Sequence, residues 1–131
     1  MQTGLTIFRV KKGKEQRAVE WMDLLVARRS ECIATLEREA MHYETIFRTN
    51  FQDRVYLAWF SVQGDAHGDV KESEHEIDKL HCAFFDECLE IDTWRPVDME
   101  HVVSFVPSEI EDFIAEANTK SQRKINGASK S

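Results

Sequence analysis

The sequence predicts an α+β protein with the element order β-α-β-β-α-β, followed by a short helix. Three observations support this prediction. Residues 42–63 alternate in the manner of a β-hairpin, a long amphipathic segment lies on each side of that hairpin, and short β-branched runs at residues 5–10 and 100–106 flank the whole arrangement. The chain has 131 residues, which is the usual length of one domain and enough to bury a single core.

The first strand is predicted at residues 5–10, which end in a Lys-Lys-Gly-Lys turn. One long helix is predicted at residues 14–39, because this segment has no proline or glycine and its apolar residues recur at helical spacing. Trp21 falls at the edge of the apolar stripe, and we expect it to face a partner surface.

The hairpin is predicted from the run HYETIFRTNFQDRVYLAWFSVQ, in which aromatic and β-branched residues alternate along two strands. Its turn falls within residues 50–53, and a two-residue turn at Gln52-Asp53 lacks the glycine that a type I′ turn prefers. The register therefore stays open at this point. A slip of one residue would exchange the two faces of a strand.

The second long helix is predicted from a cap at Asp69 to about residue 91, and Pro96 prevents its continuation. The fourth strand is predicted at residues 100–106, after which Ser108 caps a short helix. From Asn118 the chain turns polar. We therefore expect a single domain at residues 1–117 and a disordered basic tail at residues 118–131.

Right-handed crossovers lead from this order to a ferredoxin-like sandwich with a four-stranded antiparallel sheet. Its long helices cover one sheet face. The central third strand is apolar on both faces, which predicts burial on both sides. A second copy is the simplest cover, so we expect a homodimer of the dimeric α/β barrel type. We expect Tyr56 and Phe60 to face the helices, and Leu57 and Trp59 to face the partner or a pocket.

The composition favours a soluble, cytoplasmic protein that binds neither nucleic acid nor membrane. The net charge is −7, whereas phosphate binding requires clustered cations. The last 14 residues carry four cations and no acid, which leaves −11 on residues 1–117. No apolar run has the length of a signal peptide or a membrane span. Three scattered cysteines indicate free thiols, which behave as small buried hydrophobes in a reducing compartment.

One candidate ligand site lies on the hairpin. If the turn is at Gln52-Asp53, Glu44 and Arg48 share a face with Trp59, and Arg9 of the first strand joins them. A carboxylate and two guanidiniums among aromatic side chains can orient a small polar or anionic ligand. The alternative is that Glu44 and Arg48 form an ion pair at the surface or at the dimer interface.

A second candidate lies on the second long helix, where Glu74, Asp78 and His81 fall on one face. Such a trio can bind a metal or hold a histidine–carboxylate pair for proton transfer. The two histidines of HEIDKLH point apart, so they cannot share one ion, and no metal site is predicted. The alternatives are a solvated acidic face and a hydrogen-bonded His81 at the edge of the core.

Four segments resemble an uncharacterised family of small bacterial proteins that carries only a domain-of-unknown-function name. They are ETIFR at residues 44–48, YLAWF at 56–60, ESEHEIDKLH at 72–81 and RPVD at 95–98. The resemblance covers about residues 5–106. At the level of fold it implies the dimeric α/β barrel proteins, which include cofactor-free monooxygenases, haem-degrading enzymes and small isomerases. It assigns no catalytic residues and leaves any cofactor unknown, since a fold hosts many functions.

Three functions remain open. The first is a homodimer that binds a small organic molecule between sheet and helices. The second is a cofactor-free enzyme whose pocket is lined by Trp59, Tyr56 and His81, with His81 as proton shuttle and Arg48 as anion anchor. The third is a purely structural or interaction module. A cavity with convergent polar groups would favour the first two, and a filled sheet face would favour the third.

Overall fold

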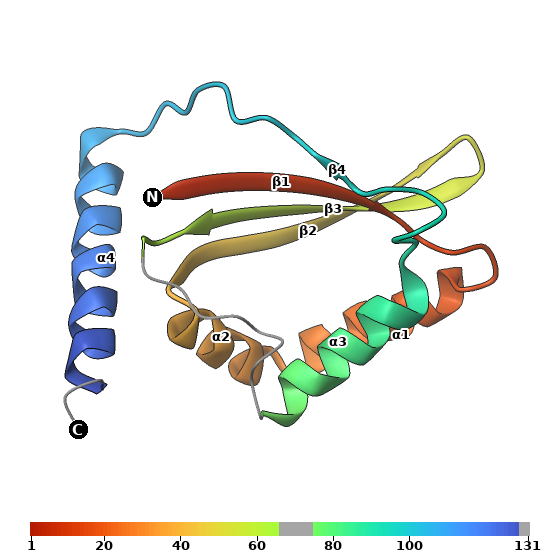
Figure 1. Ribbon diagram of the computed structural model, residues 1–131, viewed down its shortest axis with the longest axis horizontal. Helices are drawn as coiled ribbons and strands as arrows, with labels where there is room; N and C mark the ends of the chain where they lie inside the picture. The colour runs from red at the N-terminus through yellow and green to blue at the C-terminus, as the bar shows by residue number, and fades with distance from the viewer. Residues whose placement is uncertain (66–74, 129–131) are drawn as a thin grey trace.

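The computed structural model describes residues 1–65 and 75–128. Its elements are, in chain order, β1 (Gln2–Arg9), α1 (Glu15–Ala27), α2 (Arg29–Arg38), β2 (Met41–Phe51), β3 (Arg54–Gln63), α3 (Glu76–Cys88), β4 (Val97–Asp98) and α4 (Ser108–Ala128). The strands form one antiparallel sheet in the order β2-β3-β1-β4 (Figure 1). The predicted α+β class and the four-stranded antiparallel sheet are confirmed.

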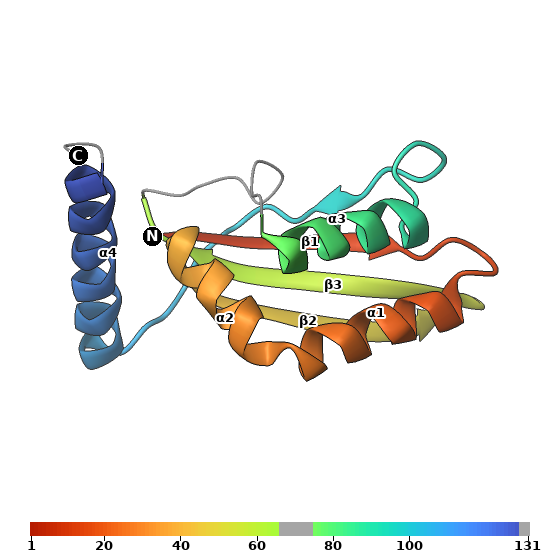
Figure 2. The ribbon, with the colours of Figure 1, turned by 90° about the horizontal axis from the view of Figure 1, so that it is seen from below.

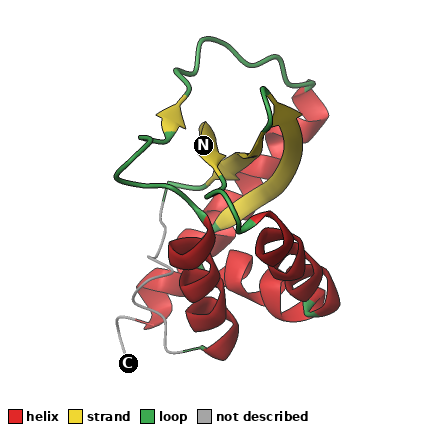
Figure 3. Ribbon diagram, turned by 90° about the vertical axis from the view of Figure 1, so that its right-hand side faces the viewer, coloured by secondary structure: helices red, strands yellow, loops and turns green. Residues whose placement is uncertain are grey.

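The helices α1, α2 and α3 lie together under one face of the sheet, and the opposite face carries no helix (Figures 1 and 2). Figure 3 shows the loop after β4 arching over the side of the strands that faces away from these helices. This loop leads to α4, which stands at the end of the sheet. No described helix is long and apolar enough to cross a membrane.

The hairpin turns at Gln52-Asp53, and Phe51 pairs with Arg54 across it. Both turn residues have positive φ, 50° and 59°, as the two central positions of a type I′ turn require. Neither residue is glycine, so the turn is strained. The strand pairing that the turn permits compensates for this strain. The register that was left open is therefore the one with the turn at Gln52-Asp53.

The faces of β3 are the reverse of the prediction. Leu57 is fully buried beneath the helices, and Trp59 packs against Trp21 of α1 at 5.7 Å between ring centroids. Tyr56 points to the other face, where it meets Trp94 at 5.6 Å. Alternation determines which residues share a face, but both faces of β3 are apolar. The pattern therefore could not show which face the helices cover.

The core is built around Trp21, whose side chain is fully buried. Its neighbours in the core are Val10, Ala18, Leu57, Cys88 and Leu89. The prediction that Trp21 faces a partner is wrong, because a large ring at the edge of a helical stripe can still reach the space between two helices and the sheet. The buried Cys88 agrees with the prediction that the cysteines act as small hydrophobes, although Cys32 and Cys82 are only half-buried.

The predicted single helix at residues 14–39 is two helices that meet at Arg28. The Arg28 N–H closes α1 on the Leu24 carbonyl, while its own carbonyl accepts the N–H groups of Glu31 and Cys32 and so begins α2. The chain changes direction at this joint (Figure 2). The segment contains no proline or glycine, so no local sequence signal marks the break. The break lets α2 follow the curved sheet.

The fourth strand is Val97–Asp98, not the predicted residues 100–106. Val97 pairs with Ile7, and the Met99 N–H still bonds to the Leu5 carbonyl, but the chain then leaves the sheet. The following loop is exposed, and Phe105 is 90% accessible. A β-branched segment has the same sequence pattern whether or not it pairs with another strand of its chain. The predicted strand therefore began too far along the sequence.

The last helix begins at the predicted Ser108 and is longer than expected. Residues 118–128, predicted as disordered tail, continue α4. Asn118 ties α4 to the end of β3, since its side-chain oxygen accepts the Asp65 N–H at 2.9 Å and its amide donates to the Asp65 carboxylate at 2.7 Å. The predicted cap at Asp69 and the carboxylate of Glu74 lie outside the described residues.

Candidate functional site

A cavity of about 720 Å³ lies between the helix-facing side of the sheet and the three helices beneath it. This volume is within the range of pockets that hold small organic molecules. Most of its lining is apolar and includes Phe8, Leu25, Ile46, Trp59, Ile77 and Phe85. Of the predicted site residues, the structure brings Glu44, Trp59 and His81 together around this cavity.

His81 lies on the α3 side of the cavity and is half-buried. The indole Nε1–H of Trp21 donates to its Nδ1 at 3.1 Å, and the Trp59 ring lies 5.5 Å from its ring. Burial lowers the pKa of His81, and the nearby Asp78 carboxylate raises it in part. The imidazole is therefore neutral near pH 7. Because Nδ1 accepts a hydrogen bond, the proton sits on Nε2, and His81 offers a ligand a donor.

Glu44 lies on β2 directly opposite Ser61, and both residues line the cavity. Burial raises the pKa of the Glu44 carboxyl, and hydrogen bonding with the Trp59 side chain lowers it in part. Trp59 is thus a neighbour of both Glu44 and His81. The predicted ion pair between Glu44 and Arg48 is not formed.

Arg48 takes no part in the cavity. It pairs with Leu57 across the hairpin, so it has the predicted parity, but its side chain is exposed beyond the cavity lining. Leu57 opposite it is fully buried, whereas Arg48 lies on β2, the edge strand of the sheet, where its side chain is exposed. The structure therefore gives no support to Arg48 as an anion anchor inside the cavity.

Asp78 is not the solvated carboxylate that the pattern of α3 suggested. It is only 4% exposed and forms an ion pair with Arg38 of α2 at 3.3 Å. The pair joins α2 to α3 at the wall of the cavity. His81 is partly buried, as one alternative predicted, but its hydrogen-bond partner is Trp21 of α1 and not Asp78 or a residue of the sheet.

Arg9 and Tyr56, two further predicted site residues, belong to a different cluster on the open face of the sheet. There Glu90 accepts hydrogen bonds from Arg9 Nε and, at 2.6 Å, from Arg54 Nη2. The Arg9 guanidinium lies over the Trp94 ring at 5.2 Å, which is a cation–π distance. These two arginines hold the pKa of Glu90 down at about 2. The sequence analysis missed Arg54, Glu90 and Trp94, which have no common spacing.

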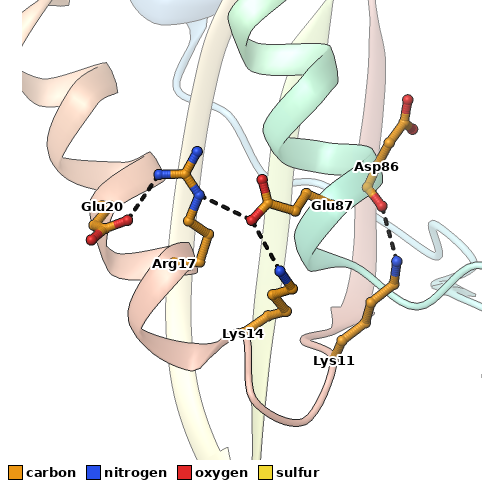
Figure 4. A network of polar contacts seen from close by, with 6 residues as sticks. All are labelled: Lys11, Lys14, Arg17, Glu20, Asp86 and Glu87. Atoms are coloured by element: carbon orange, nitrogen blue, oxygen red, sulfur yellow. Dashed lines mark hydrogen bonds and ion pairs between the residues drawn. The ribbon is translucent and has the colours of Figure 1, made fainter.

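A third polar network holds the helices together at the surface (Figure 4). Glu87 of α3 accepts from Arg17 Nε of α1 at 3.0 Å and pairs with Lys14 Nζ at 3.3 Å. Arg17 also pairs with Glu20 at 2.9 Å. All of these side chains are at least one-third exposed. Each pair contributes little stability by itself, so the network serves to align α1 with α3.

The described residues contain no group of three histidine, cysteine or acidic side chains that could hold a metal ion. The thiols of Cys32 and Cys88 have pKa values raised by burial, which suppresses the reactive thiolate. The cavity thus contains the carboxyl group of Glu44, the neutral imidazole of His81 and several aromatic side chains.

The comparison with protein-family models gives one match, a family of unknown function, DUF6176, over residues 1–112. No curated protein and no solved structure matches the chain. The match spans the sheet, all the helices around the cavity and the first turn of α4. The chain therefore belongs to the DUF6176 family of unknown function.

Proposed function

We propose that this protein binds a small organic molecule in the cavity between its sheet and its helices, and that it does so as a homodimer. The fold is then a ferredoxin-like sandwich of the dimeric α/β barrel type, in which two copies join through their open sheet faces. The single observation that carries the binding proposal is the cavity of about 720 Å³, which has an apolar lining and a few inward polar groups.

The open face of the sheet supports the dimer. Phe47 on this face is 61% exposed and Tyr43 is 55% exposed, and Phe60 lies beside them on the neighbouring strand. Contiguous exposed apolar surface of this kind marks an interaction site. A C2 dimer would bury this face on both copies at once.

The binding proposal is tested by filling the cavity. Tryptophan fluorescence of the wild type should change on titration with 2-phenylethanol, because Trp59 lines the cavity and Trp21 packs against Trp59. Ser61→Phe places a ring in the cavity and should abolish the response. Ala83→Phe adds the same ring on the exposed side of α3 and should leave the response intact. Saturable binding that Ser61→Phe leaves unchanged would contradict the proposal.

The dimer is tested by light scattering at micromolar concentration. The wild type should show twice the mass of the chain, 15.3 kDa. Phe47→Glu places a charge on the open face and should give a monomer, whereas Ala83→Glu should remain a dimer. A wild type that scatters as a monomer would refute the dimer and leave the cavity proposal standing.

A second candidate is a cofactor-free enzyme of the same structural type. The observation that favours it is the presence of two titratable groups in one cavity, Glu44 with a raised pKa and His81 with a lowered pKa. Since His81 carries its proton on Nε2, it would stabilise an oxyanion as a donor, and Glu44 would act as the base. Deuterium exchange into phenylacetone, catalysed by the wild type and lost in Glu44→Gln, would support this candidate; a wild-type rate equal to that of buffer would exclude it for this ketone.

A further inference from the structure

Two carboxylates of low solvent exposure, Glu90 and Asp78, form ion pairs with arginines, and over the ranges that the structure describes Glu44 does not. Glu90 lies between Arg9 and Arg54, and Asp78 pairs with Arg38. Glu44 is half-buried in the wall of a cavity, yet it makes no ion pair with any of the described residues. Burying a carboxylate is costly unless an opposite charge compensates it. The cavity wall therefore contains an acid to which the described part of the chain supplies no counter-charge.

The charged and titratable groups around the cavity do not change this conclusion. Those that line it from the helices are Arg29, Cys32, Glu39, Asp78 and His81. Asp78 is neutralised by Arg38, the imidazole of His81 is uncharged near pH 7, and burial keeps the Cys32 thiol protonated. Arg29 is exposed at the rim and forms no ion pair with Glu44. Among the residues that the structure describes, no cation around the cavity forms an ion pair with the carboxyl group of Glu44.

The surroundings of Glu44 are those that favour a cation. The Trp59 side chain is a hydrogen-bonding neighbour of Glu44, and Phe8 and Phe85 also line the cavity. Aromatic faces attract ammonium groups, most strongly when water is excluded, and tryptophan is the best of them. A carboxylate in a cavity lined by aromatic side chains can thus bind an ammonium group, while the apolar lining accommodates the rest of the molecule.

We propose that the cavity binds a small organic amine, whose ammonium group pairs with Glu44 among the aromatic side chains of the cavity and whose apolar body lies between the helices and the sheet. This inference rests on the proposed function of the cavity as a ligand site and names the class of its ligand. His81 Nε2–H remains available for a hydroxyl or carbonyl oxygen elsewhere on the same molecule.

Amine binding must be linked to the protonation of Glu44. The free carboxyl group resists ionisation because it is buried, and an ammonium ion beside it favours the ionised form. Binding therefore releases a proton wherever Glu44 is still protonated in the free protein. The affinity for the amine should rise with pH until Glu44 is ionised in the free protein and should then become constant, as long as the amine stays charged.

The test compares three probes of similar size: 2-phenylethylamine, 2-phenylethanol and 3-phenylpropanoate. We expect the full-length wild type to bind the amine at least about tenfold more tightly than the alcohol, and the carboxylate most weakly. Glu44→Gln should remove the preference for the amine and leave the affinity for the alcohol within about threefold, because the glutamine keeps the shape of the site. Glu116→Gln changes the net charge equally on exposed α4 and should behave as the wild type.

Calorimetry in two buffers of different ionisation enthalpy, carried out within the pH range where the affinity for the amine rises, should show proton release with the amine and none with the alcohol. Equal affinity for amine and alcohol, or a preference for the amine that persists in Glu44→Gln, would overturn this inference. Alcohol binding that Ser61→Phe abolishes would still support the cavity as the ligand site. Failure of all three probes to bind the wild type would overturn both proposals.

Discussion

Glu44 and Glu90 lie on opposite faces of one sheet and have opposite electrostatics. Glu90 accepts hydrogen bonds from two arginines, and its pKa falls to about 2. Glu44 has an indole neighbour and no paired cation within the described part of the chain, and burial raises its pKa. A carboxylate that is satisfied within the chain contributes to the fold, whereas one that is left unsatisfied costs stability. An unsatisfied carboxylate is therefore the better indicator of a binding site.

The histidines and carboxylates of the cavity show the same contrast at shorter range. Asp78 has its cation in Arg38, so it is a structural residue despite its place in the cavity wall. His81 has one ring nitrogen occupied by Trp21 and the other left for a ligand. Among the described residues, the cavity wall therefore combines a carboxylate that has its cation, Asp78, with Glu44, which has none, and with a histidine whose Nε2–H can donate to a ligand.

The largest expected effect is on the open face. Glu90→Gln leaves Arg9 and Arg54 without their shared carboxylate and should lower the free energy of unfolding by about 2 kcal/mol. Thermal or urea unfolding measures this loss, with Glu116→Gln as the exposed control. A change of less than about 0.5 kcal/mol would mean that solvent screens this cluster as it screens a surface pair.

The same substitution should change the acid limb of the stability curve. The folded pKa of Glu90 is about 2 and its ordinary value is 4.5, so the wild type gains stability from this group above pH 4.5 and loses it as pH falls toward 2. The Glu90→Gln variant lacks this carboxyl, and its curve should be flatter over that interval. Identical slopes in the two proteins would show that Glu90 is not strongly paired in solution.

A smaller effect is expected in the core beside the cavity. Trp21→Phe keeps an aromatic ring but removes the donor to His81 Nδ1, and should cost about 1–2 kcal/mol of stability. The decisive measurement is the ¹⁵N spectrum of the His81 ring. In the wild type the proton should reside on Nε2, and in the variant both tautomers should be populated. A wild type with its proton on Nδ1 would contradict the assignment of His81 as a donor.

The smallest effect, and the one with opposite sign, is expected at Glu44. Its folded pKa is raised, so the folded state binds the proton more tightly and the carboxyl group costs stability once pH exceeds its ordinary value of 4.5. Glu44→Gln should therefore be neutral at acid pH and slightly stabilising above neutrality, by about 0.5 kcal/mol, because the group is only half-buried. Urea unfolding at pH 4 and pH 8 gives the comparison. Destabilisation at pH 8 would indicate that Glu44 already has a cation in the free protein.

The hairpin was the most predictable part of the candidate site. The turn at Gln52-Asp53 places Glu44, Ile46 and Trp59 on one face, and the structure has this register. The structure places Glu44, Trp59 and His81 around one cavity, whereas the sequence analysis grouped Glu44 with Trp59, and Trp59 with His81, but did not place all three in one site. Arg9 and Tyr56 were grouped with these residues wrongly, because a parity argument within each strand does not say which side of the sheet the helices cover.

Other features could not be found from local patterns at all. The joint at Arg28 has no proline or glycine to mark it, and the burial of Asp78 depends on Arg38 of another helix. The strand predicted at residues 100–106 has the right composition but no partner within the described chain, so only Val97–Asp98 joins the sheet. The cluster of Arg9, Arg54 and Glu90 joins three distant segments.

The sequence by itself determined the α+β class, the existence of the hairpin, and the family, because alternation, helical spacing and short runs of residues are local properties. The tertiary structure alone decided which face of β3 is covered, which carboxylates acquire cations and which one does not. Those outcomes depend on distances between segments that are far apart along the chain. Glu44 and Glu90 are both glutamates in the sequence. Only packing makes Glu90 a structural residue and Glu44 a candidate ligand contact.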